Sequence, residues 1–104
     1  MVTQQYRQGD VLLKRIDALP ADAELQNADQ DRVVLAYGEV TGHAHAIDAS
    51  VASLYRSGQK DVLKVLPGAV LRHEEHTELP LDPGFYEVIR QREYEPLGWR
   101  QVAD

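Results

Sequence analysis

The stretch VASLYRSGQKDVLKVL, residues 51–66, decides the fold class of this chain. It contains two runs rich in β-branched and apolar residues, Val51 to Arg56 and Asp61 to Leu66. The residues between them, Ser57 to Lys60, include a glycine. Two strand-like runs joined by a short glycine-containing segment are typical of a β-hairpin. The stretch therefore predicts two antiparallel strands with a four-residue loop.

Short apolar runs separated by turn residues continue along the rest of the chain. Segment 17–31 is expected to be a loop with one short helical turn starting at Pro20, and 79–84 a second loop. Gly9 and Asp10 predict a turn. We expect a single domain, residues 1–104, with an all-β fold, a small barrel or sandwich of about seven short strands. Besides the hairpin, strands are expected at 11–16, 32–37, 42–47, 69–74, 85–94 and 99–102.

The composition limits the chemistry to nitrogen and oxygen ligands. The chain has 104 residues, 43% of them hydrophobic, a formal charge of −6 and no cysteine. Without cysteine there is no disulfide, thiolate nucleophile or cysteine-bound metal. A net acidic domain is a poor partner for nucleic acid. Because no apolar leader or long apolar run is present, we expect a cytoplasmic protein with no membrane partner.

All four histidines lie in two short strings, HAH from His43 to His45 and HEEH from His73 to His76. Neutral imidazole is the commonest metal ligand in proteins. Residues i and i+2 of a strand share a face, so His43 and His45 are expected to project together. His73 and His76 differ by three and need a bulge or a strand end to meet. The pattern predicts a metal site built from these four residues.

The two histidine strings do not determine which metal binds or which reaction follows. Imidazoles with a carboxylate suit Zn, Fe, Ni, Cu or Mn, and we expect Zn, Fe, Ni or Mn. Four histidines around zinc would form a closed, structural site, whereas three would leave a position for water or substrate. In an open site Glu74 or Glu75 would complete the shell or act as a general base. The alternative is that the histidine strings are structural or surface features without a metal.

A second group of polar residues ends the predicted strand 85–94. By alternation Arg90, Arg92 and Tyr94 share one face of that strand. They are candidates for binding an anionic group of a substrate beside the metal. The alternative is a solvated strand end, which is common for such residues.

The strings carry two resemblances. His43, His45 and His73 resemble the metal-site pattern of the cupins, which are small β-barrels, although Asp48 is the only carboxylate that closely follows the H-x-H string. The combination of YRQGDV at 6–11, GHAH at 42–45, HEEH at 73–76 and QREY at 91–94 is similar to a group of small uncharacterised bacterial and phage proteins. That second resemblance implies no established activity.

Two functions therefore stand side by side. The first is a metal-binding β domain, with catalysis on an unknown substrate if its site is open. The second is a non-catalytic module that binds a protein partner. The partner is an unknown small molecule or protein, and exposed strand edges would allow a homodimer.

Overall fold

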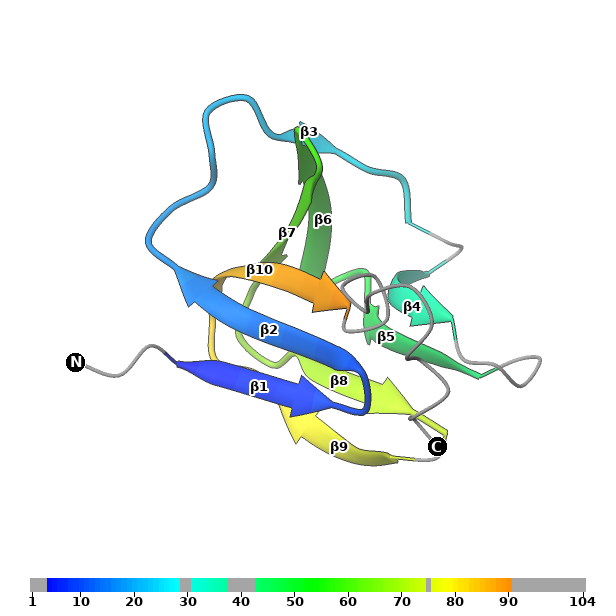
Figure 1. Ribbon diagram of the computed structural model, residues 1–104. Coiled ribbons are helices and arrows are strands. Elements are labelled where there is room, and N and C mark those ends of the chain that lie inside the picture. The colour runs from blue at the N-terminus through cyan, green and yellow to red at the C-terminus, as the bar shows by residue number, and fades with distance from the viewer. Residues whose placement is uncertain (1–3, 29–30, 38–42, 75, 91–104) are drawn as a thin grey trace, which may run out of the picture.

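The described part of the chain consists of strands, turns and loops, with no helix. The computed structural model describes residues 4–28, 31–37, 43–74 and 76–90, and Figure 1 shows their arrangement. The predicted all-β class is confirmed, but these residues form ten strands rather than about seven. None of them belongs to a helix long and apolar enough to cross a membrane. The strands are β1 (Gln5–Gln8), β2 (Val11–Ile16), β3 (Glu24–Leu25), β4 (Arg32–Tyr37), β5 (Ala44–Asp48), β6 (Ala52–Ser57), β7 (Lys60–Val65), β8 (Val70–His73), β9 (His76–Pro80) and β10 (Gly84–Arg90).

The strands form two antiparallel sheets. One sheet has six strands in the order β1-β2-β10-β7-β6-β3, and the other has four in the order β4-β5-β8-β9. Each sheet buries one face in the core. The side chains on that face are mainly apolar, and they stabilise the sheet only when they are covered. The described strands thus form two separate sheets that share a core, and they do not close into the barrel that was the other expectation.

The core lies between the two sheets and is mainly aliphatic. Among the described residues, Tyr86 on β10 is the one large aromatic side chain of the core with no exposed surface. The Tyr86 hydroxyl donates a hydrogen bond to the Asp82 carbonyl oxygen at 2.7 Å. Burial raises the pKa of Tyr86 to about 12, so the phenol stays neutral and remains a donor. The largest fully buried side chains are Tyr86, Leu13, Leu35, Ile47, Leu63, Leu71, Val11 and Val62.

The hairpin predicted at 51–66 is present as β6 and β7, with a tighter turn than expected. Ser57 pairs with Lys60, so only Gly58 and Gln59 connect the strands. Gly58 has a φ of 63°. Two-residue hairpin turns require a positive φ at the first central position, which glycine adopts without steric cost. Gly58, which indicated a loop in the sequence, is therefore also the residue that allows a turn of only two residues.

The three strands that the sequence did not predict are all edge strands. β1 and β3 are the two edges of the six-stranded sheet, and β9 is an edge of the four-stranded sheet. Most of their residues are exposed or half-buried. An edge strand buries few side chains, so its sequence shows little apolar alternation. For this reason β3 and β9 replace parts of segments that were expected to be loops.

Other expectations changed in detail. The helical turn expected at Pro20 is wrong, because 17–28 contains no helix; Ala23 N donates to Pro20 O at 3.1 Å in an isolated turn. The strand expected at 42–47 is β5, which extends to Asp48. The end of the long strand, 91–94, and the expected strand 99–102 lie outside the described residues.

An ion pair within the six-stranded sheet lies next to a contact between the two sheets. Asp61 on β7 is 7% exposed, and its Oδ2 lies 2.7 Å from Arg90 Nη2 on β10. Arg90 Nε also donates to the Leu35 carbonyl oxygen at 2.6 Å, and Leu35 belongs to β4 of the other sheet. Arg56 reaches the second Asp61 oxygen at 3.2 Å from a more exposed position. Arg90 therefore links the sheets, while Arg56 covers the pair from outside.

The two arginines on Asp61 provide a matched test of this role. Arg90→Ala should lower the free energy of unfolding by about 2 kcal/mol, because it leaves a buried carboxylate and a carbonyl short of a donor. Arg56→Ala should cost less than about 1 kcal/mol, as is usual for an exposed pair. Urea denaturation measures both. Equal losses would contradict a link between the sheets through Arg90.

Candidate metal centre

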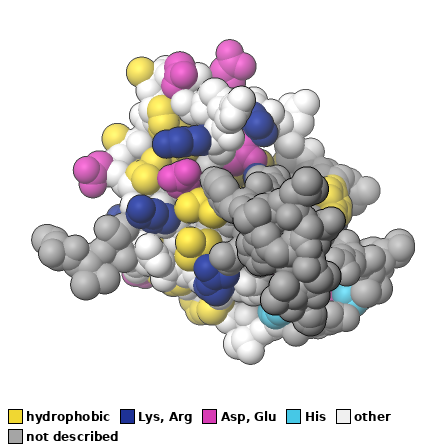
Figure 2. Space-filling model, in the orientation of Figure 1, with side chains coloured by type: hydrophobic (Ala, Val, Ile, Leu, Met, Phe, Trp, Pro, Cys, Tyr) yellow, Lys and Arg dark blue, Asp and Glu magenta, His cyan; other side chains and the backbone are white. Residues whose placement is uncertain are grey.

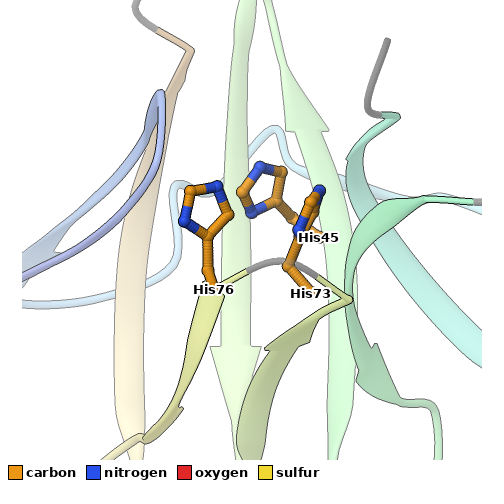
Figure 3. Close-up of side chains that lie close together, drawn as sticks. All are labelled: His45, His73 and His76. Carbon is orange, nitrogen blue, oxygen red and sulfur yellow. The ribbon is translucent and has the colours of Figure 1, made fainter. Parts of the chain in front are cut away.

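Both histidine strings meet at one end of the four-stranded sheet. His45 lies on β5 and is buried, His73 ends β8 and His76 begins β9. The pairing of β8 with β9 changes register between Leu71 and His73, so His73 lies opposite His76. This strand end and register shift bring together two residues three apart in sequence. Figure 3 shows the three rings converging from their strands.

The geometry of this three-histidine group (His45, His73 and His76) is close to that of a metal shell. Ring centroids lie 4.3 Å apart for His45 and His73, 4.6 Å for His73 and His76, and 5.6 Å for His45 and His76. One nitrogen from each ring lies within 4.8 Å of the others. Around a tetrahedral zinc ion with bonds of about 2.1 Å, ligand nitrogens are about 3.4 Å apart. Small rotations of the side chains would bring the three nitrogens from within 4.8 Å of one another to about 3.4 Å.

Gln8 determines which nitrogen of His45 carries the proton. The Gln8 side chain is buried, and its Nε2 donates to the carbonyl oxygens of Leu71 at 3.1 Å and Thr77 at 3.0 Å. The amide oxygen is then left to accept, and His45 Nδ1 lies 2.8 Å from it. Nδ1 must therefore carry the hydrogen, so Nε2 of the neutral ring holds the lone pair. This is the arrangement in which metal-bound histidines are usually oriented.

The turn between β1 and β2 covers the rings. Gly9 has a φ of 59°, and a Cβ there would lie 2.8 Å from His76 Nε2 and 3.2 Å from His45 Cε1. The next residue, Asp10, places Oδ1 3.5 Å from His45 Nε2. A carboxylate oxygen thus faces the nitrogen whose lone pair points into the group. The turn expected at Gly9 and Asp10 is present, and it forms one wall of the site.

His43 belongs to a second, overlapping group. One ligand atom each from His43, His73 and Glu74, here called the His43 group, also lies within 4.8 Å of the other two. The His43 and His73 rings are 5.8 Å apart and nearly perpendicular. Glu74 Oε1 accepts a hydrogen bond from Ala44 N at 3.1 Å. Hydrogen bonds from its own backbone N–H and from Ala44 hold the pKa of Glu74 below its usual value, which keeps the carboxylate charged.

The four histidines predicted as metal ligands are thus divided between two groups. The described residues place the imidazoles in two groups that share His73, and no group contains all four. The reason is that β5 begins at Ala44. His43 precedes the strand, and the alternation that was to align it with His45 does not extend to it.

An open cavity of about 400 Å³ lies beside the His43 group. His73 and Glu74 contribute to its wall, and Ala44 and Ala46 of β5 also line it. Small alanine side chains on a strand leave room above the sheet. Among the described residues on the face that Figure 2 displays, acidic and basic side chains are interspersed.

The remaining predicted site residues are not brought into this cluster by the described structure. Arg90 contacts Asp61 and Leu35, as described above. Glu75, Arg92 and Tyr94 lie outside the described residues. Their proposed roles as general base and substrate ligands stay predictions.

Sequence reasoning did not identify Gln8 and Gly9 as part of the site. Neither residue type suggests a metal site by itself, because Gln8 acts through His45 and Gly9 acts by lacking a side chain. The signal that could have found them is the string YRQGDV at 6–11, which accompanied the histidine strings in the family resemblance.

The comparison with known families agrees with that resemblance at a coarse level. A family described as "Domain of unknown function (DUF8820)" matches residues 7–91. The chain belongs to this family. The DUF8820 match spans Gln8 to Asp10 and both histidine strings, so the whole candidate centre lies inside it. No curated protein and no solved structure matches the chain.

Two glycines with nearly equal φ test the close approach at the turn. Gly9→Ala should lower the free energy of unfolding by about 2 kcal/mol, because a methyl group adds a clash with His76 to the strain of a positive φ. Gly58→Ala has the same strain and open space around the new Cβ, so its cost should be about 1 kcal/mol. Urea denaturation gives both values. A Gly9→Ala cost no larger than that of Gly58→Ala would contradict the contact.

The tautomer of His45 can be observed without any substitution. At pH about 8, where free imidazole is neutral, two-bond ¹H–¹⁵N correlation spectra should show a protonated Nδ1 and an unprotonated Nε2. The reason is that Gln8 presents only an acceptor to Nδ1. A proton on Nε2 instead would mean that the Gln8 amide is turned the other way.

Proposed function

We propose that this DUF8820 domain binds a divalent transition metal ion through His45, His73 and His76. One observation carries the proposal: one ring nitrogen from each of these three histidines lies within 4.8 Å of the other two. Asp10 Oδ1, 3.5 Å from His45 Nε2, adds a negative charge beside the group, and that charge favours a cation there.

The donor set fits ions of borderline softness. Neutral imidazoles suit Zn, Fe, Ni and Mn, and the chain has no thiolate that would select a softer ion. Three protein nitrogens would leave a coordination position open beside Asp10. A bound ion would supply Lewis acidity there and would lower the pKa of a water molecule.

We extend the proposal to metal-dependent catalysis on a small substrate. The cavity that His73 and Glu74 line supports this step, because through it a substrate would reach His73, the member of the three-histidine group that lines it. Glu74, charged and held by Ala44, is the candidate general base. The cupin pattern would place His45 and His73 as ligands, in agreement with this centre, but it would also include His43, which lies in the other group.

Metal analysis of untagged protein, purified without chelator, tests the first step. We expect near-stoichiometric metal in the wild type. In a His43→Ala background, which disrupts the His43 group, His45→Ala should weaken binding by at least about 100-fold, because it removes a ligand of the three-histidine group. Gln8→Ala should weaken binding by about 10- to 100-fold with unchanged stoichiometry, since it removes only the partner that orients a ligand. Titration calorimetry with Zn²⁺ measures both affinities.

Circular dichroism provides the control, because His45 and Gln8 are both buried. The proposal fails if the folded wild type takes up none of Zn, Fe, Ni and Mn after each is added back. It also fails if, in the His43→Ala background, folded His45→Ala binds as tightly as the parent variant. In either case the histidine strings would be structural or recognition features, and the alternative of a non-catalytic interaction module would be the one to pursue.

A further inference from the structure

We propose that the centre has two alternative positions for one ion, and that His73 is a ligand in both. The second position consists of His43, His73 and Glu74. This inference rests on the proposed metal binding at the three-histidine group and adds a site to it. In each position the ion would bind His73 together with the other two ligands of one group, and it would exchange between the two groups.

The position of the His73 ring is the first support. Its centroid lies 4.3 Å from that of His45, 4.6 Å from that of His76 and 5.8 Å from that of His43. The ring is therefore a neighbour of every other histidine in the chain. Each of the two groups is complete as a three-ligand set only when His73 is counted in it.

The chemistry of imidazole makes the two positions exclusive. A neutral ring has one nitrogen with a lone pair and one that carries a hydrogen. It can therefore serve one ion at a time. Two ions at once would require His73 to lose its second ring proton, which a neutral site does not favour. The wild type should consequently bind one ion, although it has two sets of ligands.

Glu74 makes the second position different in kind from the first. Its carboxylate is fixed by the Ala44 N–H at 3.1 Å, beside His43 at the start of β5. The second position thus has two nitrogens and one oxygen, whereas the first has three nitrogens. A site with a carboxylate favours harder ions than an all-imidazole site. The cavity adjoins this second position through His73 and Glu74.

Stoichiometry with Co²⁺ in single variants tests the proposal. Calorimetry should give one ion for the wild type, for His43→Ala and for His76→Ala, and none for His73→Ala. His76→Ala retains only the second position, so its visible Co²⁺ spectrum should differ from that of His43→Ala. None of these three side chains is fully buried, and circular dichroism checks that each variant folds.

Glu74→Gln provides a matched control in two backgrounds. Combined with His76→Ala, it should lower the remaining Co²⁺ affinity by about 10-fold or more, because the ion is left with the second position alone. Combined with His43→Ala, it should change the affinity by less than about 2-fold. Equal effects in the two backgrounds would overturn the assignment of Glu74 to the second position.

The outcomes separate this inference from the proposed function. If His76→Ala binds no ion while His43→Ala binds one, the second position is overturned and the three-histidine centre stands. If His43→Ala binds none while His76→Ala binds one, the three-histidine centre falls instead. Two ions in the wild type would overturn the shared role of His73.

Discussion

The Gln8 side chain is the constraint on which the candidate centre depends. The Gln8 amide is buried, so its two N–H donors and its oxygen acceptor all need hydrogen-bond partners. An unpaired buried amide costs about 1–3 kcal/mol. Gln8 finds these partners in the carbonyl oxygens of Leu71 on β8 and Thr77 on β9, and in the His45 ring on β5. One side chain from β1 of the six-stranded sheet thus contacts three strands of the other sheet. The same hydrogen bonds that join the sheets set the tautomer of His45.

The centre is built from strand ends, edge strands and a turn rather than from the middle of a sheet. His73 and His76 lie where β8 meets β9, and β9 is an edge. Gly9 brings the backbone of the β1–β2 turn against the rings. Central strands bury their side chains on each other and leave little room for an ion or a ligand. Strand ends leave polar groups available, and functional residues in proteins concentrate there for that reason.

The strongly patterned parts of the chain were predictable from its sequence. β2, β4, β6, β7, β8 and β10 all coincide with runs of apolar or β-branched residues. Edge strands were missed because their side chains are exposed and need no apolar period. Arg90 shows a different limit. Alternation along β10 places Arg90 on the same face as Tyr86 and Val88, and that face is the interior, where Arg90 meets Asp61. The sequence alone does not show whether a charged residue near a strand end pairs with a buried side chain or binds a substrate.

The sequence by itself determined the class of the fold and the kinds of atoms available to the centre. The short β-rich runs determined that the chain forms sheets. Four histidines and no cysteine determined that the ligand atoms are nitrogen and oxygen. Only the tertiary structure decided which ligands meet. The register shift before His73, the start of β5 at Ala44 and the approach of Gln8 and Gly9 from the other sheet divide the histidines into two groups. The physical reason is that alternation fixes a side chain's face within one strand, whereas the pairing of strands far apart in sequence depends on how the two sheets pack.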